Sequence, residues 1–266
     1  MNPAAEAAVV FERVTLAYGR RTILADVDLT LPRGSVTAVL GPSGAGKSTL
    51  LRAAVGELTP SAGRIRVLGE TLPRPNVRSL FALRRHMGVM LQGNGLLSDL
   101  DVFENVALPL RTHTRLPEAL IDELVRMKLA AVGLGEAGHL ETSELSGGMA
   151  RRVALARAVV MDPPLMFYDE PLTGLDPIAC SVIVELIRGL NDALGMTSLV
   201  ITHNIREVVA VADQVLIVAN RGIVFAGTPQ QLAATDDPLV RQFMDGLPDG
   251  PIGFDYRAAR RDAAHA

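Results

Sequence analysis

Apolar positions along the chain follow two different spacings, and each predicts its own kind of element. Short apolar runs are typical of strands buried on both faces of a sheet. They occupy residues 36–40, 87–91, 164–168 and 199–202. Residues 9–18 carry a mixed pattern and residues 27–31 alternate, which predicts strands with one exposed face, and a further short strand is predicted at 64–68. Residues 215–219 and 223–226 flank a turn and are expected to form a hairpin.

Spacings of three and four residues predict helices between these strands. Pro117 opens a helix that ends at Gly133. Its predicted buried face consists of Leu120, Ile121, Leu124, Val125, Leu129 and Val132. Asp176 is a helix cap followed by Pro177 in the first helical position. The predicted face of that helix consists of Ile178, Val182, Leu186, Leu190 and Leu194, and another helix is expected over residues 150–161.

The order of these elements predicts an α/β fold with a mainly parallel core sheet. Residues 1–235 are expected to form one domain, in which 7–92 and 160–235 make the α/β core and include an antiparallel β-subdomain. Residues 93–159 look like an inserted helical subdomain.

The last segment, residues 236–266, is rich in Pro, Gly and Asp and has the composition of a tail. Its apolar residues are spaced along it rather than clustered, at Phe243, Ile252, Phe254 and Tyr256. This spacing favours a tail that docks on another surface, whereas its composition leaves disorder open.

Composition excludes several classes of protein. The net charge is −3 and no basic tract is present, which argues against nucleic acid as the main partner. No apolar run is long enough to span a bilayer, and the N-terminus does not have the pattern of a secretory signal. Cys180 is the only cysteine, so a reducing compartment fits. The mean hydropathy of +0.27 is high and is equally consistent with a docking face or a large core.

Residues 41–49 match the pattern G-x-x-x-x-G-K-[ST], which cradles phosphate groups. Glycines let successive N–H groups point inward, and the following helix adds partial positive charge. A buried strand precedes the loop and a helix follows it, as the pattern requires. Lys47 is placed to reach the β- and γ-phosphates of ATP, and Ser48 to ligate Mg²⁺. The candidate nucleotide-binding residues here are Gly41, Ser43, Gly44, Ala45, Gly46, Lys47, Ser48 and Thr49.

Polar residues at the ends of two other predicted strands complete the candidate chemistry. Asp169 and Glu170 follow one strand, where Asp169 would hold Mg²⁺ and Glu170 would orient or deprotonate the attacking water. His203 follows another strand at the edge where ligands gather. Tyr18 precedes a turn and could stack on adenine, or be an ordinary core or surface tyrosine.

A second candidate anion site is the sequence Leu145-Ser146-Gly147-Gly148-Met149. Ser146 is a natural helix cap, and the two glycines leave main-chain N–H groups uncovered at the positive end of a helix. The motif is weak alone, because Ser-Gly-Gly before a helix also occurs in ordinary loops. It gains weight in a chain that already has a phosphate loop.

Taken in order, these motifs together with Gln92 resemble those of ABC-transporter ATPase subunits, P-loop NTPases with an inserted helical subdomain. The resemblance runs from about Val9 to Leu232. It implies that Tyr18 stacks on adenine, that Gln92 senses Mg²⁺ and the attacking water, and that His203 contacts the γ-phosphate. Ser146, Gly147 and Gly148 would bind the ATP of a second copy packed head to tail, and Asp176 in the Leu175-Asp176 loop would also be a nucleotide-binding residue.

A narrower resemblance is to the ATPases of the maintenance-of-lipid-asymmetry (Mla) systems, which move phospholipid between the two membranes of Gram-negative bacteria. It rests on residues 104–111, Met149, residues 150–152 and residues 240–246. Met149 stands where Gln is commoner, which leaves backbone contacts to ATP intact. The resemblance implies a place on the cytoplasmic face of the inner membrane, a multi-pass permease, a periplasmic MCE-domain subunit and a small STAS-domain subunit. It also implies that the tail reaches a neighbouring ATPase.

Three other protein classes share parts of this pattern. An importer ATPase for a small polar solute differs only in the narrower resemblance. ATPases of repair and translation carry long coiled-coil insertions or two cores in one chain, and neither is present in the sequence. A P-loop kinase is disfavoured by the Ser-Gly-Gly motif.

Overall fold

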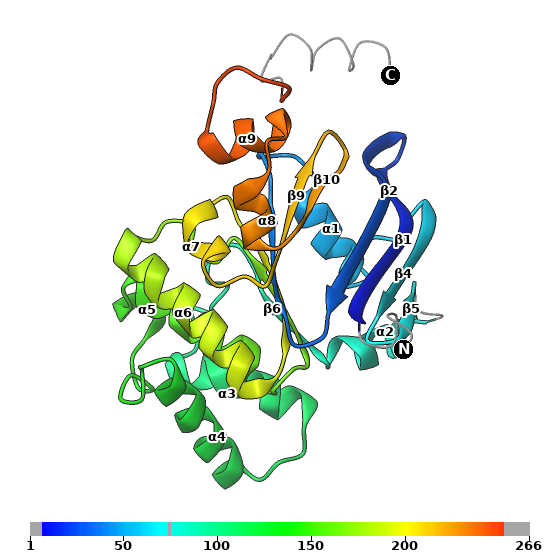
Figure 1. Cartoon of the computed structure of the whole chain (residues 1–266). Helices are drawn as coiled ribbons and strands as arrows, with labels where there is room; N and C mark the ends of the chain where they lie inside the picture. Colours follow the sequence, from blue (N-terminus) through cyan, green and yellow to red (C-terminus); the bar gives the residue numbers. More distant parts are fainter. Residues whose placement is uncertain (1–6, 74–75, 253–266) are drawn as a thin grey trace.

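The computed structural model describes residues 7–73 and 76–252, and it contains two sheets (Figure 1). The smaller sheet is antiparallel with the strand order β2-β1-β4-β5. Its strands are β1 (Ala7–Tyr18), β2 (Arg21–Pro32), β4 (Ala62–Val67) and β5 (Glu70–Leu72). The described residues form two hydrophobic core clusters, and one face of this sheet packs on the smaller cluster, which contains Phe11, Leu16 and Leu24. The antiparallel β-structure expected around the phosphate loop is therefore present.

The larger sheet has six strands in the order β10-β9-β3-β8-β7-β6. They are β3 (Val36–Leu40), β6 (Met87–Met90), β7 (Leu165–Asp169), β8 (Thr197–Ile201), β9 (Gln214–Ala219) and β10 (Gly222–Gly227). All neighbouring pairs are parallel except β9 and β10, which form the predicted hairpin. Every residue of β3 and β8 is buried, which explains why their sequences are mostly apolar. The predicted α/β class is confirmed.

Helices flank both sheets and build a separate lobe. Figure 1 shows the lobe helices on the side of the molecule away from the antiparallel sheet. They are α3 (Val102–His113), α4 (Glu118–Ala131), η2 (Thr142–Glu144) and α5 (Gly147–Val159), and α3 packs against both α4 and α5. The other helices are α1 (Lys47–Ala54), α2 (Val77–Arg84), α6 (Pro177–Leu194), α7 (Ile205–Val209), α8 (Pro229–Ala234) and α9 (Pro238–Asp245). None of the helices in the described ranges is long and apolar enough to cross a bilayer.

Two predicted helix details were wrong. The buried stripe of α6 is Cys180, Ile183, Val184, Ile187 and Leu190, whereas Ile178 is 79% exposed. Residues spaced by four advance about 40° around a helix of 3.6 residues per turn. The predicted stripe therefore starts on the exposed side at Ile178 and reaches the buried face only at Leu190. The helix expected over 150–161 begins at Gly147, because the Ser146 hydroxyl caps it by accepting from Met149 N at 3.2 Å.

Part of the predicted tail is a packed helix. Asp237 caps α9, Val240 is fully buried, and Phe243 and Met244 pack against the larger hydrophobic cluster. The Gln242 amide accepts from Ile252 N at 2.6 Å and donates to Ile252 O at 3.1 Å, which fixes the chain after α9. The remainder of the predicted tail, residues 253–266, lies outside the described residues.

Truncation should separate these two parts of the tail. Removing residues 238–266 exposes the apolar surface that α9 covers, and we expect it to cost at least about 3 kcal/mol of unfolding free energy, from two or more buried side chains. Removing only 253–266 leaves α9 and every described contact in place, so this shorter truncation should melt at a higher temperature than the longer one. Thermal denaturation of both truncated chains checks this. Equal melting temperatures for the two would contradict the packing of α9.

Gly88 in β6 lies where a side chain has no room. A Cβ atom there would lie 2.4 Å from Met166 Sδ and 2.5 Å from the Ala158 carbonyl oxygen of α5. Gly88→Ala should therefore lower the unfolding free energy by about 1–3 kcal/mol, as overpacking of a core does. Gly189→Ala on α6 is the matched control, because nothing lies near that position. The control should stabilise the chain by up to about 1 kcal/mol, because alanine favours the helix. Denaturant titration measures both changes.

Candidate functional site

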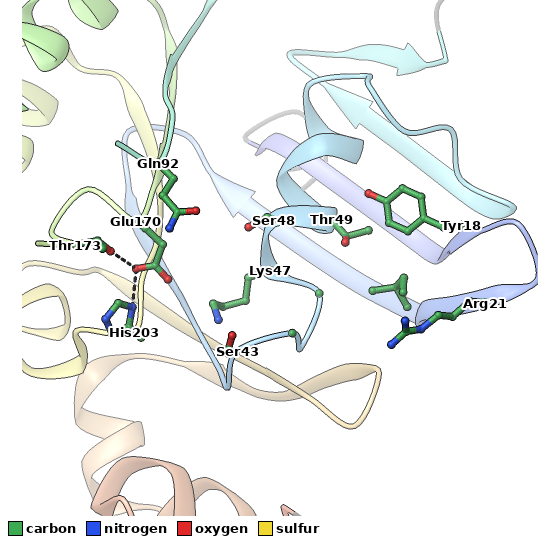
Figure 2. A pocket seen from close by; sticks show the side chains of 13 residues that line it. Tyr18, Arg21, Ser43, Lys47, Ser48, Thr49, Gln92, Glu170, Thr173 and His203 are labelled. Carbon is green, nitrogen blue, oxygen red and sulfur yellow. Dashed lines mark hydrogen bonds and ion pairs between the residues drawn. The ribbon is translucent and has the colours of Figure 1, made fainter. Parts of the chain in front are cut away.

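A cavity of about 600 Å³ opens at the carboxyl edge of the parallel strands (Figure 2). β3, β6, β7 and β8 all end there, as expected for a ligand site in an open α/β sheet. The cavity brings together ten residues that the sequence predicted. They are Tyr18, Ser43, Gly44, Gly46, Lys47, Ser48, Thr49, Gln92, Glu170 and His203.

The phosphate loop follows β3 and turns directly into α1. Gly41 has φ 148°, and a Cβ atom there would lie 2.2 Å from the Val218 carbonyl oxygen, so only glycine fits. The Lys47 ammonium donates to the carbonyl oxygens of Gly41 at 2.7 Å and Pro42 at 3.0 Å. Burial lowers the pKa of Lys47, and the carboxylates of Glu170 and Asp169 oppose this shift. The loop thus holds one largely buried cation beneath the cavity.

Oxygen donors from two distant segments meet beside this loop. The Ser48 hydroxyl donates to Asp169 Oδ1 at 3.3 Å, which joins the first turn of α1 to the end of β7. Burial raises the pKa of the Asp169 carboxyl, and the Ser48 hydrogen bond opposes that rise. Gln92 lines both this spot and the main cavity. A hydroxyl, a carboxylate and an amide oxygen are ligands that suit Mg²⁺, which takes its remaining ligands from phosphate and water.

Glu170 is held by contacts on three sides. Its Oε2 atom lies 2.8 Å from His203 Nδ1 and accepts from Thr173 Oγ1 at 3.4 Å (Figure 2). Its N–H donates to the Ile201 carbonyl at 2.8 Å, and its φ of 52° lies in the left-handed region. A non-glycine residue in that region is strained, and such strain gathers at functional sites. The side chain is only 14% exposed, so its carboxylate faces the cavity from a fixed position.

Seven predicted residues do not line the cavity. Gly41 and Ala45 lie in the loop behind it, and Asp169 lines the adjoining pocket. Asp176 caps α6, with Oδ1 accepting from Ile178 N at 2.9 Å and Ala179 N at 3.0 Å, so its carboxylate is occupied within its own chain. The three residues of the Ser-Gly-Gly motif, Ser146, Gly147 and Gly148, also lie outside the cavity wall.

Sequence reasoning missed three residues of the cavity wall. Arg21 and Ile23 come from β2, and Thr173 comes from the loop after β7. Arg21 closely follows Tyr18 across a turn, a proximity that could have indicated it. Tyr18 is 44% exposed and its hydroxyl accepts from Arg52 at 3.3 Å, which rules out a core tyrosine. Arg21, Ile23 and Tyr18 all belong to the antiparallel sheet, which therefore forms one part of the cavity wall.

A family model described as "ABC transporter" matches residues 24–173, which is more than half of the chain. The match includes the phosphate loop, Ser146 and the Asp169-Glu170 pair. The chain belongs to the ABC transporter family. Its fold is that of the ATPase cassettes of this family, and the resemblance inferred from the motifs is confirmed.

Similar proteins extend the match over nearly the whole chain. The intermembrane phospholipid transport system ATP-binding protein MlaF of Escherichia coli is 49% identical over 92% of this chain and 91% of its own length. The structure of CbiO1 from Clostridium perfringens, part of the ABC transporter complex CbiONQ, has a TM-score of 0.82 at 30% identity, covering 91% of this chain and 96% of that one.

A second solved structure bears on the enzymatic reaction. It is the dimer of the ATP-binding cassette MJ0796 in a post-hydrolysis state with ADP and phosphate. Its TM-score is 0.76 at 28% identity, covering 83% of this chain and 98% of that one. As a member of this ABC family, the chain is an ATPase whose cassettes work as dimers.

Proposed function

We propose that this chain is the ATPase subunit of a transporter that moves phospholipid between the inner and outer membranes of a Gram-negative envelope. The observation that carries the proposal is the 49% identity to the E. coli intermembrane phospholipid transport ATPase over 92% of the chain. Identity at that level extends well beyond the motifs that all ABC ATPases share.

The residues of the cavity have distinct roles in ATP hydrolysis. Tyr18 stacks on the adenine, and the main-chain N–H groups of residues 43–49 together with Lys47 bind the phosphates. Ser48, Asp169 and Gln92 would hold Mg²⁺, which would supply positive charge against the phosphates. Glu170 orients the attacking water and accepts its proton, while His203 contacts the γ-phosphate. The His203 contact also fixes the Glu170 carboxylate in place.

The site is completed by a second copy of the chain. Ser146, Gly147 and Gly148 lie outside the chain's own cavity, and at the first turn of α5 their N–H groups form a positive helix end that suits a phosphate. In a two-fold head-to-tail dimer each copy presents this end to the ATP held by the other. Asp176 stands at the start of the neighbouring helix and shapes the same interface through its cap. ATP therefore joins the two copies, and hydrolysis releases them.

The partners follow from the same proposal. The ATPase dimer sits on the cytoplasmic face of the inner membrane under a multi-pass permease and drives it by opening and closing. A periplasmic MCE-domain subunit and a small STAS-domain subunit complete the assembly. Docking of the 236–266 tail on a neighbouring subunit stays a prediction, because residues 253–266 lie outside the described residues. A dimeric relative among the solved structures supports the pairing of cassettes.

Gentle co-purification tests this proposal. The tagged full chain is expressed in its own host, the membranes are solubilised in mild detergent, and the bound proteins and lipids are identified by mass spectrometry. We expect a permease, an MCE-domain protein and phospholipid above the level in a mock purification. If a solute-binding protein is found instead and no MCE subunit, the chain is still an ATPase, but the transported substrate is a small polar solute and not phospholipid.

A further inference from the structure

Arg151 lies on the second turn of α5 and joins two loops of the candidate site. It is 6% exposed. Its Nη1 atom donates to the Gly93 carbonyl oxygen, and its Nη2 atom donates to the Thr173 carbonyl oxygen at 2.9 Å. The planar guanidinium suits this arrangement, because its donors hold two acceptors in a fixed relative position.

Each of these carbonyls belongs to a loop that carries a reactive group. Gly93 directly follows Gln92 in the loop after β6. Thr173 contacts Glu170 twice, since its hydroxyl donates to Oε2 at 3.4 Å and its N–H donates to the Glu170 carbonyl at 3.4 Å. One acceptor of Arg151, Gly93, is therefore the residue next to Gln92 in the chain. The other acceptor, Thr173, is itself hydrogen-bonded to Glu170.

The third element that Arg151 joins is the Ser-Gly-Gly motif itself. α5 starts from the Ser146 cap, and an α-helix between that cap and Arg151 keeps the two at a fixed separation. Both hydrogen bonds that Arg151 makes within the described chain go to main-chain carbonyls and not to a carboxylate. Burial lowers the pKa of this guanidinium. A buried cation without an ion pair is costly to stability, so its place is better explained by positioning than by stabilisation.

The other two arginines of α5 make their hydrogen bonds to other segments. Arg152 donates to the carbonyls of Val132 and Gly133 at the end of α4. Arg157 donates to the Gly95 carbonyl at 2.8 Å and does not reach the Thr173 loop. The bridge between the two loops is therefore specific to Arg151 among these three arginines.

We propose that Arg151 is a positioning residue that couples the Ser-Gly-Gly end of α5 to the hydrolytic groups of its own chain. When the nucleotide of the second copy binds against that end, α5 shifts as a rigid body. Arg151 carries the shift to the Gln92 loop and to the Glu170–Thr173 loop together. The inference rests on the proposed head-to-tail dimer and adds the side chain through which one site reports its occupancy to the other.

Three variants of the full chain test the inference. Arg151→Met removes both donors while keeping an apolar stem, and Arg151→Lys keeps a cation but loses the planar pair of guanidinium donors. Arg188→Met is the matched control. Arg188 pairs with Asp192 and with Asp213, which lies at the amino end of β9, whereas the cavity lies at the carboxyl ends of the parallel strands. For each variant we would measure kcat and KM for ATP, the affinity for a fluorescent ATP analogue, and the melting temperature.

We expect Arg151→Met to lower kcat by about 10- to 100-fold, a size typical of misplaced catalytic groups, with analogue affinity within threefold of the parent. Arg151→Lys should recover part of the lost kcat, and Arg188→Met should keep kcat within twofold. If Arg151→Met does not fold, a reduced kcat at unchanged affinity in Arg151→Lys supports the inference. An unchanged kcat in the folded Arg151 variants overturns it, as does a loss of kcat in Arg188→Met of the same size.

The Glu170→Gln chain separates this inference from the proposed dimer. ATP-dependent dimerisation of Glu170→Gln, measured by light scattering, tests the dimer without involving Arg151. If that chain stays monomeric with ATP, the proposed dimer fails. If it dimerises and Arg151→Met hydrolyses ATP at the parental rate, only the role of Arg151 fails.

Discussion

Replacing Glu170 by glutamine should stop ATP turnover while leaving ATP bound. The amide keeps the size and the Thr173 contact of the side chain but cannot accept the proton of the attacking water. We expect kcat to fall by about 100-fold or more, the range in which general bases contribute. Nucleotide affinity should stay within a few-fold of the parent, and the ATP-bound chain should elute as a dimer in size-exclusion chromatography.

Glu185→Gln is the control for this substitution. Glu185 lies on the exposed face of α6 and does not line the cavity, so its loss should leave kcat unchanged. A Glu170→Gln chain with normal turnover would remove Glu170 from the catalytic role. The His203 contact would then have to be explained as a purely structural one.

The second large effect is expected from Lys47→Ala. The Lys47 ammonium is the buried cation of the phosphate loop, and hydrogen bonds from a charged donor contribute about 2–3 kcal/mol. Its loss should weaken ATP binding by about 30- to 150-fold, which follows from that free energy. Equilibrium titration with a fluorescent ATP analogue measures the change directly.

The second lysine of the sequence provides the comparison. Lys128 on α4 is buried and pairs with Asp162, and it does not line the cavity. Lys128→Met should lower stability without changing ATP affinity. If both lysine variants weakened ATP binding equally, the loss in Lys47→Ala would reflect general damage to the fold and not a phosphate contact.

Most of the site could be predicted because its phosphate-binding and catalytic residues belong to short contiguous sequence motifs. The phosphate loop, Asp169-Glu170 and His203 each follow a strand, and parallel strands bring their carboxyl ends to one edge. Thr173 and Arg151 were missed because their contact with each other depends on how distant segments approach. No local pattern contains that information.

The same limit applies to the helices. α6 is apolar around more than half of its circumference, so its sequence does not decide which stripe is buried until its neighbours are in place. The composition of residues 236–252 is that of a loop or tail, yet α9 packs because Val240 and the Gln242 amide find partners in the rest of the chain. Composition alone cannot report those partners.

The strand order fixes the width of the site. β8 lies between β3, which leads into the phosphate loop, and β7, which ends at the catalytic carboxylates. Two strand spacings make this separation about 10 Å, and main-chain hydrogen bonds set it. Side-chain substitutions therefore cannot widen the phosphate end. Tyr18, Arg21 and Ile23 come from the other sheet, so an engineer could alter the preference for the nucleotide base there while leaving the hydrolytic geometry intact.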